Sequence, residues 1–146
     1  MASNAMIATS HPLASQVGID IMKSGGNAVD AAIAACATLC VVEPAMTGIG
    51  GDCFALYSPA GSTVPLALNG SGRAPKAASV DGIRAQGIST IEVQSAHAVT
   101  VPGAIAAWTK LNADHGHKSM EELLAPAINY AQNGFPVTVS YTHLRA

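Results

Sequence analysis

The longest apolar stretch of the chain, residues 28–42, predicts a helix with a sharply marked start. Gly25 and Gly26 before it can adopt the left-handed conformation that closes a preceding helix. Asn27 is a favoured N-cap, and Asp30 places a carboxylate in the first turn, where it complements the helix dipole. Because a helix that is apolar on all sides is normally buried, we expect a central helix packed under a sheet. The stretch is too short to predict a membrane span.

The segment before this helix carries two weaker patterns. Residues 6–9 form a short apolar run that is typical of a strand. Ser10 is a candidate N-cap for the helix that follows, and Pro12 falls in its first turn, a favoured place for proline. Apolar residues then recur at a spacing of four, which predicts a helix with one buried face.

Beyond residue 44 the pattern changes to short apolar runs separated by glycine and proline. The glycine cluster within residues 47–57 leads into a strand, and residues 64–68 resemble the return strand after a turn-forming segment, which predicts a β-hairpin. A short helix is expected over residues 80–86, and strands are expected over residues 91–93 and 98–101.

The last third of the chain predicts two helices, over residues 104–114 and 120–132. Ser119 and Glu122 form a capping-box pattern at the start of the second, and Pro126 inside it is expected to produce a kink. Helices and the hairpin alternate without a regular strand–helix–strand repeat. The predicted fold class is therefore α+β and not a doubly wound sheet.

Composition adds one constraint to this picture. Hydrophobic residues make up 49% of the 146 residues, but charged residues only 11% and aromatic residues 4%. The usual charged share is about a quarter, so we expect the chain either to self-associate or to belong to a larger body. A net charge of −2 without a basic run disfavours binding to nucleic acid or to a membrane surface. No secretory signal pattern is seen, which favours the cytoplasm.

The cysteines and histidines do not suggest a metal or cofactor site. Cys36, Cys40 and Cys53 lack the spacing of a disulfide or zinc framework, and the first two are expected to be small buried hydrophobes. The five histidines lack metal-ligand spacing as well. No metal and no cofactor are therefore predicted.

Two glycine-containing loops are the candidates for function. Residues 48–51, Gly-Ile-Gly-Gly, lack the Lys-Ser/Thr of a phosphate-binding loop and precede a strand, so we expect a close approach of their backbone to another strand or a substrate. Arg73 lies on the second loop, among glycines, in a chain with few charges. Such an arginine is suited to bind a carboxylate with two hydrogen bonds. A surface arginine that caps a turn is the alternative.

Short motifs with a characteristic order occur over residues 6–138: His11–Ser15, Gly25–Ala32, Val42–Pro44, Gly48–Gly51, Gly72–Pro75, Val101–Gly103, Leu123–Ile128 and Gly134–Val137. Together they resemble the γ-glutamyltranspeptidase family of N-terminal-nucleophile hydrolases. The resemblance implies the N-terminal portion of the large subunit, and hence an incomplete part of an αββα sandwich. It further implies a self-cleaving precursor whose new N-terminal threonine takes an acyl group, typically γ-glutamyl, from an amide and passes it to water or an amine.

The arginine loop departs from the family pattern Arg-Glu-x-Ala-Pro, whose arginine holds the α-carboxylate of the substrate. Ser71 occupies the place of that arginine here, and Arg73 is displaced by two positions. The resemblance implies Arg73 as the substrate-binding residue. The departure puts γ-glutamyl specificity in question, because the pattern is closer to members that hydrolyse other amides, such as oxamate amidohydrolase or acylases.

No threonine of the chain lies in the context of the family's cleavage site, so no catalytic residue is assigned within it. We expect residues 1–5 to be a tag or leader and residues 139–146 to be a tail foreign to the family. The chain alone is predicted to be inactive, with the missing C-terminal part, the small subunit and a small amide substrate as its partners. Two alternatives are a stand-alone non-catalytic binding or assembly module and a small nucleotide-binding protein.

Overall fold

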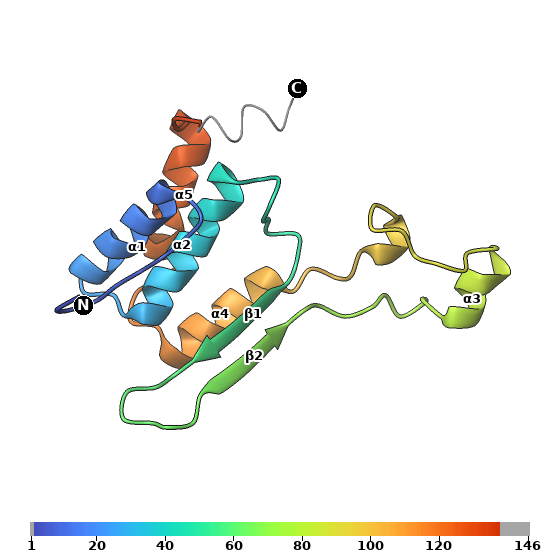
Figure 1. Cartoon of the computed structure of the whole chain (residues 1–146), viewed down its shortest axis with the longest axis horizontal. Helices are drawn as coiled ribbons and strands as arrows, with labels where there is room; N and C mark the ends of the chain where they lie inside the picture. Colours follow the sequence, from blue (N-terminus) through green and yellow to red (C-terminus); the bar gives the residue numbers. More distant parts are fainter. Residues whose placement is uncertain (1, 138–146) are drawn as a thin grey trace. The chain divides into compact units, whose positions relative to one another are not determined.

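The computed structural model of the protein describes residues 2–137, and these residues fall into two compact units (Figure 1). The first, termed the helical unit, comprises the residues up to 49 and those from 108 onward. The second, termed the hairpin unit, comprises residues 50–107. Helices together with an antiparallel strand pair confirm the predicted α+β class.

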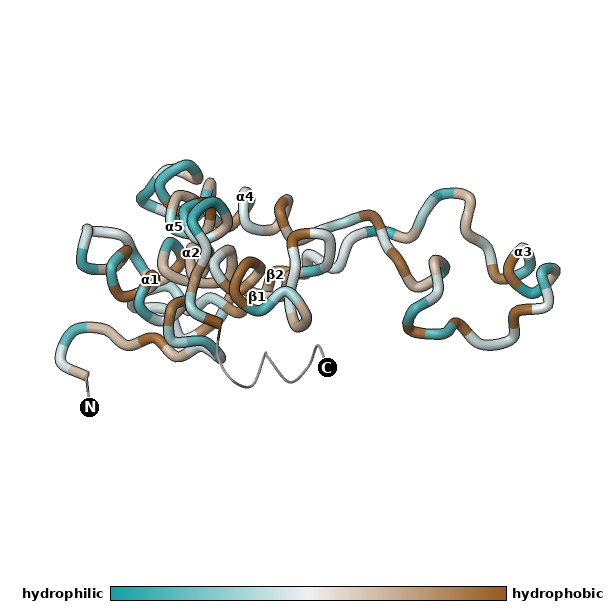
Figure 2. Tube along the Cα trace, turned by 90° about the horizontal axis from the view of Figure 1, so that it is seen from above, coloured by the Kyte–Doolittle hydropathy of each residue, from teal (hydrophilic) through white to brown (hydrophobic). Residues whose placement is uncertain are grey.

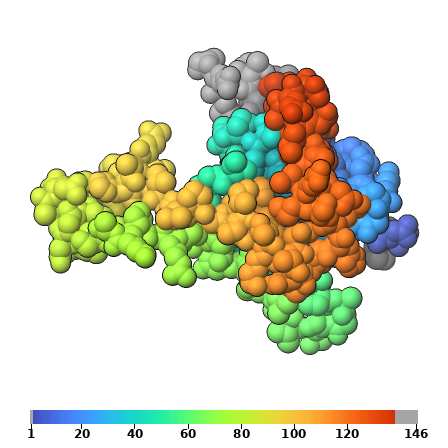
Figure 3. Space-filling model, turned by 180° about the vertical axis from the view of Figure 1, so that it is seen from behind, coloured from blue at the N-terminus to red at the C-terminus, as the bar shows by residue number. Residues whose placement is uncertain are grey.

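Three helices form the body of the helical unit: α1 (Pro12–Lys23), α2 (Ala28–Val42) and α5 (Met120–Asn133). Helix α2 packs against both α1 and α5, and the space-filling view shows α5 lying against the N-terminal helices (Figure 3). The small side chains of α2 allow this close packing. Helix α4 (Ala104–His115) ends in this unit. Buried apolar residues from all four helices build the core: Ala14, Val17, Ile21, Ile33, Ala34, Trp108, Leu123 and Ala127.

The start of α2 confirms Asn27 as the N-cap that the sequence predicts, and Asp30 takes part in the cap as well. The Asn27 side chain accepts hydrogen bonds from the backbone N–H groups of Val29 and Asp30, at 2.9 and 3.0 Å. The Asp30 carboxylate accepts from the Asn27 N–H at 2.8 Å, which completes a capping box. The neighbours of this helix within its own unit are helices, whereas a covering sheet was expected.

The outer face of α2 corrects the expectation for the cysteines. Ala28, Ala32 and Cys36 are exposed, and they recur at a spacing of four along one face of the helix. Cys36 is therefore not a buried hydrophobe, and Cys40 is only half-buried. In the described part of the chain no helix is both long and apolar enough to cross a bilayer.

The entry to α1 differs from the prediction in two respects. Residues 6–9 form no strand. His11, and not Ser10, is the N-cap: its Nδ1 accepts from the Leu13 N–H at 3.2 Å, and Pro12 takes the first helical position. The Ser10 hydroxyl instead donates to the buried carboxylate of Glu43, which follows the end of α2. Ser10 therefore does not cap α1, because its hydroxyl bonds to Glu43, which is distant in the sequence.

Helix α5 begins as its sequence predicts. Ser119 and Glu122 form the expected capping box, with the Ser119 N–H donating to the Glu122 carboxylate at 3.0 Å and the Glu122 N–H donating to the Ser119 hydroxyl at 3.2 Å. The helix continues through Pro126. The kink at that residue stays a prediction.

The hairpin unit contains the predicted β-hairpin. Strand β1 (Cys53–Tyr57) pairs antiparallel with β2 (Leu66–Gly70), so that Cys53 lies opposite Gly70 and Tyr57 opposite Leu66. The second strand begins later than expected, directly after Pro65. Proline has no N–H to give to a strand ladder, which explains the later start.

The segment after β2 contains less regular structure than predicted. The short helix is confirmed as α3 (Val80–Ala85), with Ser79 as its N-cap. The strands expected over residues 91–93 and 98–101 are wrong: the segment forms loops and one 3₁₀ turn, Ala96–Ala98. Figure 2 shows apolar and polar residues interleaved along this segment. A single hydrogen bond from the Val101 N–H to the Arg73 carbonyl, at 2.9 Å, takes the place of a strand ladder.

The two units do not test the predicted domain limits. The expected boundary at residue 138 and the tail beyond it lie outside the described residues.

Candidate functional site

Arg73 lies in the hairpin unit, on the loop that leaves β2 at Gly70. Its side chain is exposed, and within residues 2–137 its guanidinium has no hydrogen-bond or ion-pair partner. The backbone of Arg73, in contrast, is held: its carbonyl accepts the Val101 N–H at 2.9 Å. A fixed backbone that carries an unpaired cation is a suitable arrangement for binding an anionic group.

The residue in the place of the family arginine, Ser71, is occupied by local hydrogen bonds. Its N–H donates to the Asn69 side chain at 3.0 Å, and its hydroxyl donates to the Gly72 carbonyl at 3.3 Å. These bonds shape a tight turn directly after β2. Ser71 carries no charge, and the cations of the loop between β2 and α3 are Arg73 and Lys76.

Two glycines allow the backbone of this loop to cross close to the backbone of residues 100–103. Gly72 has φ +78°, and a Cβ there would lie 1.9 Å from the Val101 carbonyl oxygen. A Cβ on Gly103 would lie 2.2 Å from the Gly70 carbonyl oxygen. Any side chain at either position would require the backbone to move. Gly72 and Gly103 therefore allow the two segments to pack closely.

The close approach expected for the first glycine loop is found at Gly51. Its carbonyl accepts the N–H groups of Gly103 and Ala104, at 3.0 and 3.1 Å. These donors lie at the start of α4, where helical N–H groups lack partners within the helix. Gly51 therefore holds the start of α4, whereas an approach to another strand or a substrate was expected. Gly48 and Gly50 face open space.

A hollow of about 250 Å³ lies beside α3 in the same unit. Its lining is mostly apolar, with Ser79, Gln86 and His97 as its polar members. None of these three side chains is buried. The lining of the hollow therefore contains no Asp, Glu, Lys or Arg side chain that could bind a charged ligand. Among the described residues no group of His, Cys, Asp and Glu side chains has the arrangement of a metal site.

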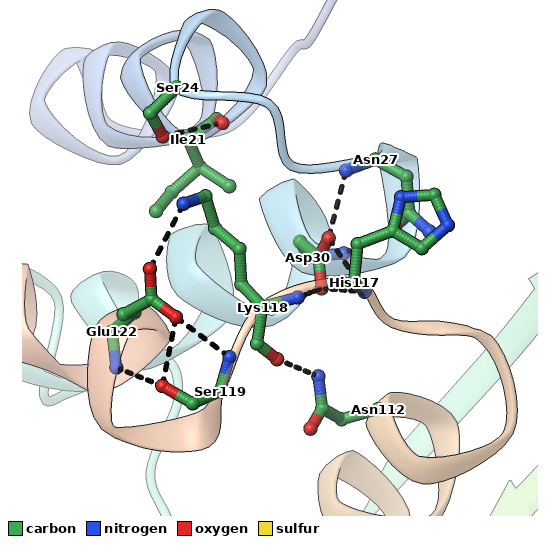
Figure 4. Close-up of polar contacts among 9 residues, drawn as sticks. All are labelled: Ile21, Ser24, Asn27, Asp30, Asn112, His117, Lys118, Ser119 and Glu122. Carbon is green, nitrogen blue, oxygen red and sulfur yellow. Dashed lines mark hydrogen bonds and ion pairs between the residues drawn. The ribbon is translucent and has the colours of Figure 1, made fainter.

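The polar cluster of the helical unit has a structural role (Figure 4). Asp30 is fully buried, and its carboxylate accepts backbone N–H groups of Asn27, His117 and Lys118 at 2.8 to 3.3 Å. The Asn27 amide donates in turn to the His115 carbonyl at 2.6 Å. Because three backbone N–H groups donate to the Asp30 oxygens, this carboxylate connects the start of α2 to the loop between α4 and α5.

The carboxyl group of Glu122, beside this cluster, has a lowered pKa. The backbone N–H of Ser119, the Lys118 ammonium and the Ser119 hydroxyl all donate to its carboxylate and lower its pKa from 4.5 to about 2. Each of these donors favours the charged form. Figure 4 shows Lys118 and Ser119 turned toward Glu122. Its acidity follows from helix capping and does not indicate catalysis.

The chain is similar to a set of known hydrolases and transferases. Residues 14–145 match the family model described as Gamma-glutamyltranspeptidase. The glutathione hydrolase-like YwrD proenzyme of Bacillus subtilis is 43% identical over 134 residues, which cover 91% of this chain and 25% of that protein.

Solved structures give the same result. The γ-glutamyltranspeptidase of Helicobacter pylori matches with a TM-score of 0.89 and 32% identity, over 99% of this chain and 42% of that one. The cephalosporin acylase from Bacillus halodurans matches with a TM-score of 0.86 and 47% identity, over 91% of this chain and 25% of that one. This chain thus spans about a quarter of the length of the curated relative.

Proposed function

Because the chain belongs to the γ-glutamyltranspeptidase family, we propose that it forms the N-terminal part of the large subunit of an enzyme that transfers an acyl group from a γ-glutamyl or related amide to water or an amine. The relative from Bacillus subtilis is named a proenzyme, which supports a precursor that matures by cleavage. In this proposal the nucleophilic N-terminal threonine belongs to a small subunit outside the 146 residues.

The observation that carries the proposal is the state of Arg73. Its guanidinium is exposed and has no partner in the described chain, while its backbone is held by Val101. An arginine presents two parallel N–H donors that match the two oxygens of a carboxylate. Arg73 would therefore bind a carboxylate of the acyl donor and orient its amide toward the threonine.

The displacement of the arginine points to the class of acyl donor. In this chain the charge stands two residues after the position that the family pattern assigns to it, and Ser71 at that position is neutral. A carboxylate bound by Arg73 would then lie at a different place along the substrate. We propose an acyl donor that carries a carboxylate but is not restricted to the γ-glutamyl group. The name of the similar cephalosporin acylase supports this wider range.

The test uses the enzyme encoded by the complete reading frame that contains this sequence. Arg73→Ala is expected to raise KM for a carboxylate-bearing amide by roughly 10- to 100-fold, with a smaller effect on kcat, because a charge-assisted bond contributes about 1.5–3 kcal/mol. Arg84→Ala removes an exposed arginine of α3 and serves as the matched control. An unchanged KM in the Arg73 variant would contradict the proposed role.

The 146-residue chain alone provides a second test. We expect no turnover of γ-glutamyl-p-nitroanilide by it, since the nucleophile is absent in this proposal. We also expect self-association, because Phe54 and Leu56 are exposed by 63% and 80% on one face of β1. Measurable turnover, or a sedimentation coefficient that stays at the monomer value as the concentration rises, would count against this assignment.

A further inference from the structure

The loop that carries Arg73 is held from one side by residues 100 and 101. The Thr100 hydroxyl donates to the Ser71 carbonyl at 3.2 Å, and the Val101 N–H donates to the Arg73 carbonyl at 2.9 Å. The two accepting carbonyls belong to the residues on either side of Gly72. One side-chain donor and one backbone donor therefore fix both ends of the Ser71–Gly72–Arg73 turn.

The local bonds of Ser71 to Asn69 and Gly72 shape the same turn, and the conformation of Gly72 restricts it further. Gly72 adopts φ +78°, and its α-carbon lies so close to Val101 that a Cβ would come within 1.9 Å of the Val101 oxygen. Arg73 and Thr100 are themselves exposed, so apolar burial contributes little at this point. The hydrogen bonds at the two carbonyls therefore help to hold the backbone from which the Arg73 side chain projects.

We propose that Thr100 is a positioning residue for Arg73, whose hydroxyl fixes the turn from which the guanidinium projects toward a substrate carboxylate. The proposal rests on the carboxylate-binding role of Arg73 given above. Thr100 acts through the Ser71 carbonyl and not by touching the substrate. Its loss should therefore weaken substrate binding and leave the chemical step nearly unchanged.

The first test compares three variants of the complete enzyme. Thr100→Val keeps the shape of the side chain but removes the donor, and it is expected to raise KM for the carboxylate-bearing amide by about 3- to 10-fold, the effect of one hydrogen bond. Thr100→Ser keeps the hydroxyl and should restore KM to within about twofold of the parent value. Thr63→Val, in the exposed hairpin loop, is the matched control and should change neither KM nor kcat.

The second test asks whether Thr100 acts through Arg73. In an Arg73→Ala background, Thr100→Val should produce no further rise in KM, because the group that it positions is gone. A rise of the same size in both backgrounds would overturn the proposal and indicate a general structural role. If Arg73→Ala raises KM and Thr100→Val does not, the positioning role fails while the proposed function stands. If Arg73→Ala itself leaves KM unchanged, both fail.

A third measurement does not depend on activity. Hydrogen exchange at the Val101 amide, which donates to the Arg73 carbonyl, should become faster in Thr100→Val and stay slow in Thr100→Ser. Equal protection of this amide in all variants would contradict the proposal. Should the valine variant fail to mature, Thr100→Ala removes the same hydroxyl and takes its place in each comparison.

Discussion

The two units of the chain are stabilised in different ways. In the helical unit, apolar side chains from α1, α2 and α5 are buried together, and the buried carboxylate of Asp30 accepts backbone N–H groups. In the described part of the hairpin unit the buried residues are only Gly103, Ala104 and Ala107. Its large apolar side chains are mostly exposed: Phe54, Leu56, Val64, Leu66, Val80, Val93, Val99 and Val101.

Buried apolar side chains therefore stabilise the helical unit, whereas contacts between backbone segments stabilise the hairpin unit. The hairpin unit is organised by hydrogen bonds between backbone segments, such as those at Gly51 and Val101, which meet because glycine lacks a side chain. Arg73 belongs to this second kind of structure. A binding residue on such a backbone crossing depends on contacts other than a packed core. Three pairs of variants test the contrast, one pair across the two units and one pair within each.

The largest effect is expected from the buried carboxylate of the helical unit. Asp30→Ala leaves the backbone N–H groups of Asn27, His117 and Lys118 without their acceptor and should lower the free energy of unfolding by about 3 kcal/mol or more. Asp81→Ala removes an exposed aspartate from the first turn of α3 and should cost less than about 1 kcal/mol. Urea denaturation followed by far-ultraviolet circular dichroism, which reports on the helices of both units, measures both. Equal losses would contradict the distinction between the units.

A smaller and more local effect is expected at the glycine crossing. Gly72 and Gly61 share φ +78°, but a Cβ on Gly72 would collide with Val101 whereas one on Gly61 would meet open space. Gly61→Ala should therefore cost only the strain of its backbone conformation, about 1 kcal/mol. Gly72→Ala should cost clearly more and should release the Val101 amide to rapid hydrogen exchange. Similar losses in the two variants would show that the crossing contributes nothing to stability.

The smallest effect concerns pH and the exposed start of α5. The pKa of Glu122 is lowered from 4.5 to about 2, first by the Ser119 N–H and then by Lys118 and the Ser119 hydroxyl. A depressed pKa means that the stabilisation is fully present above pH 4.5 and is lost as pH falls toward 2. Glu122→Gln should flatten the acid limb of the stability curve, whereas Glu121→Gln, outside the capping box, should not. Thermal melting of both variants between those pH values decides the point.

The sequence determined the elements that depend on neighbours within a few residues. The N-cap of α2, the capping box of α5, the hairpin and the short helix α3 all follow from residues that interact with their own turn or the next strand. The family also followed from sequence, because its motifs keep their order along the chain. Its agreement with the matched relatives confirms that prediction.

The tertiary structure alone decided which distant residues would meet. The Thr100 hydroxyl reaches a carbonyl 29 positions earlier, and Asp30 binds an N–H group 87 positions later. Ser10, a sound N-cap by its own sequence, instead bonds to Glu43 and leaves the cap to His11. No local pattern encodes such pairs, because each is fixed only after the whole backbone has brought two separate segments together.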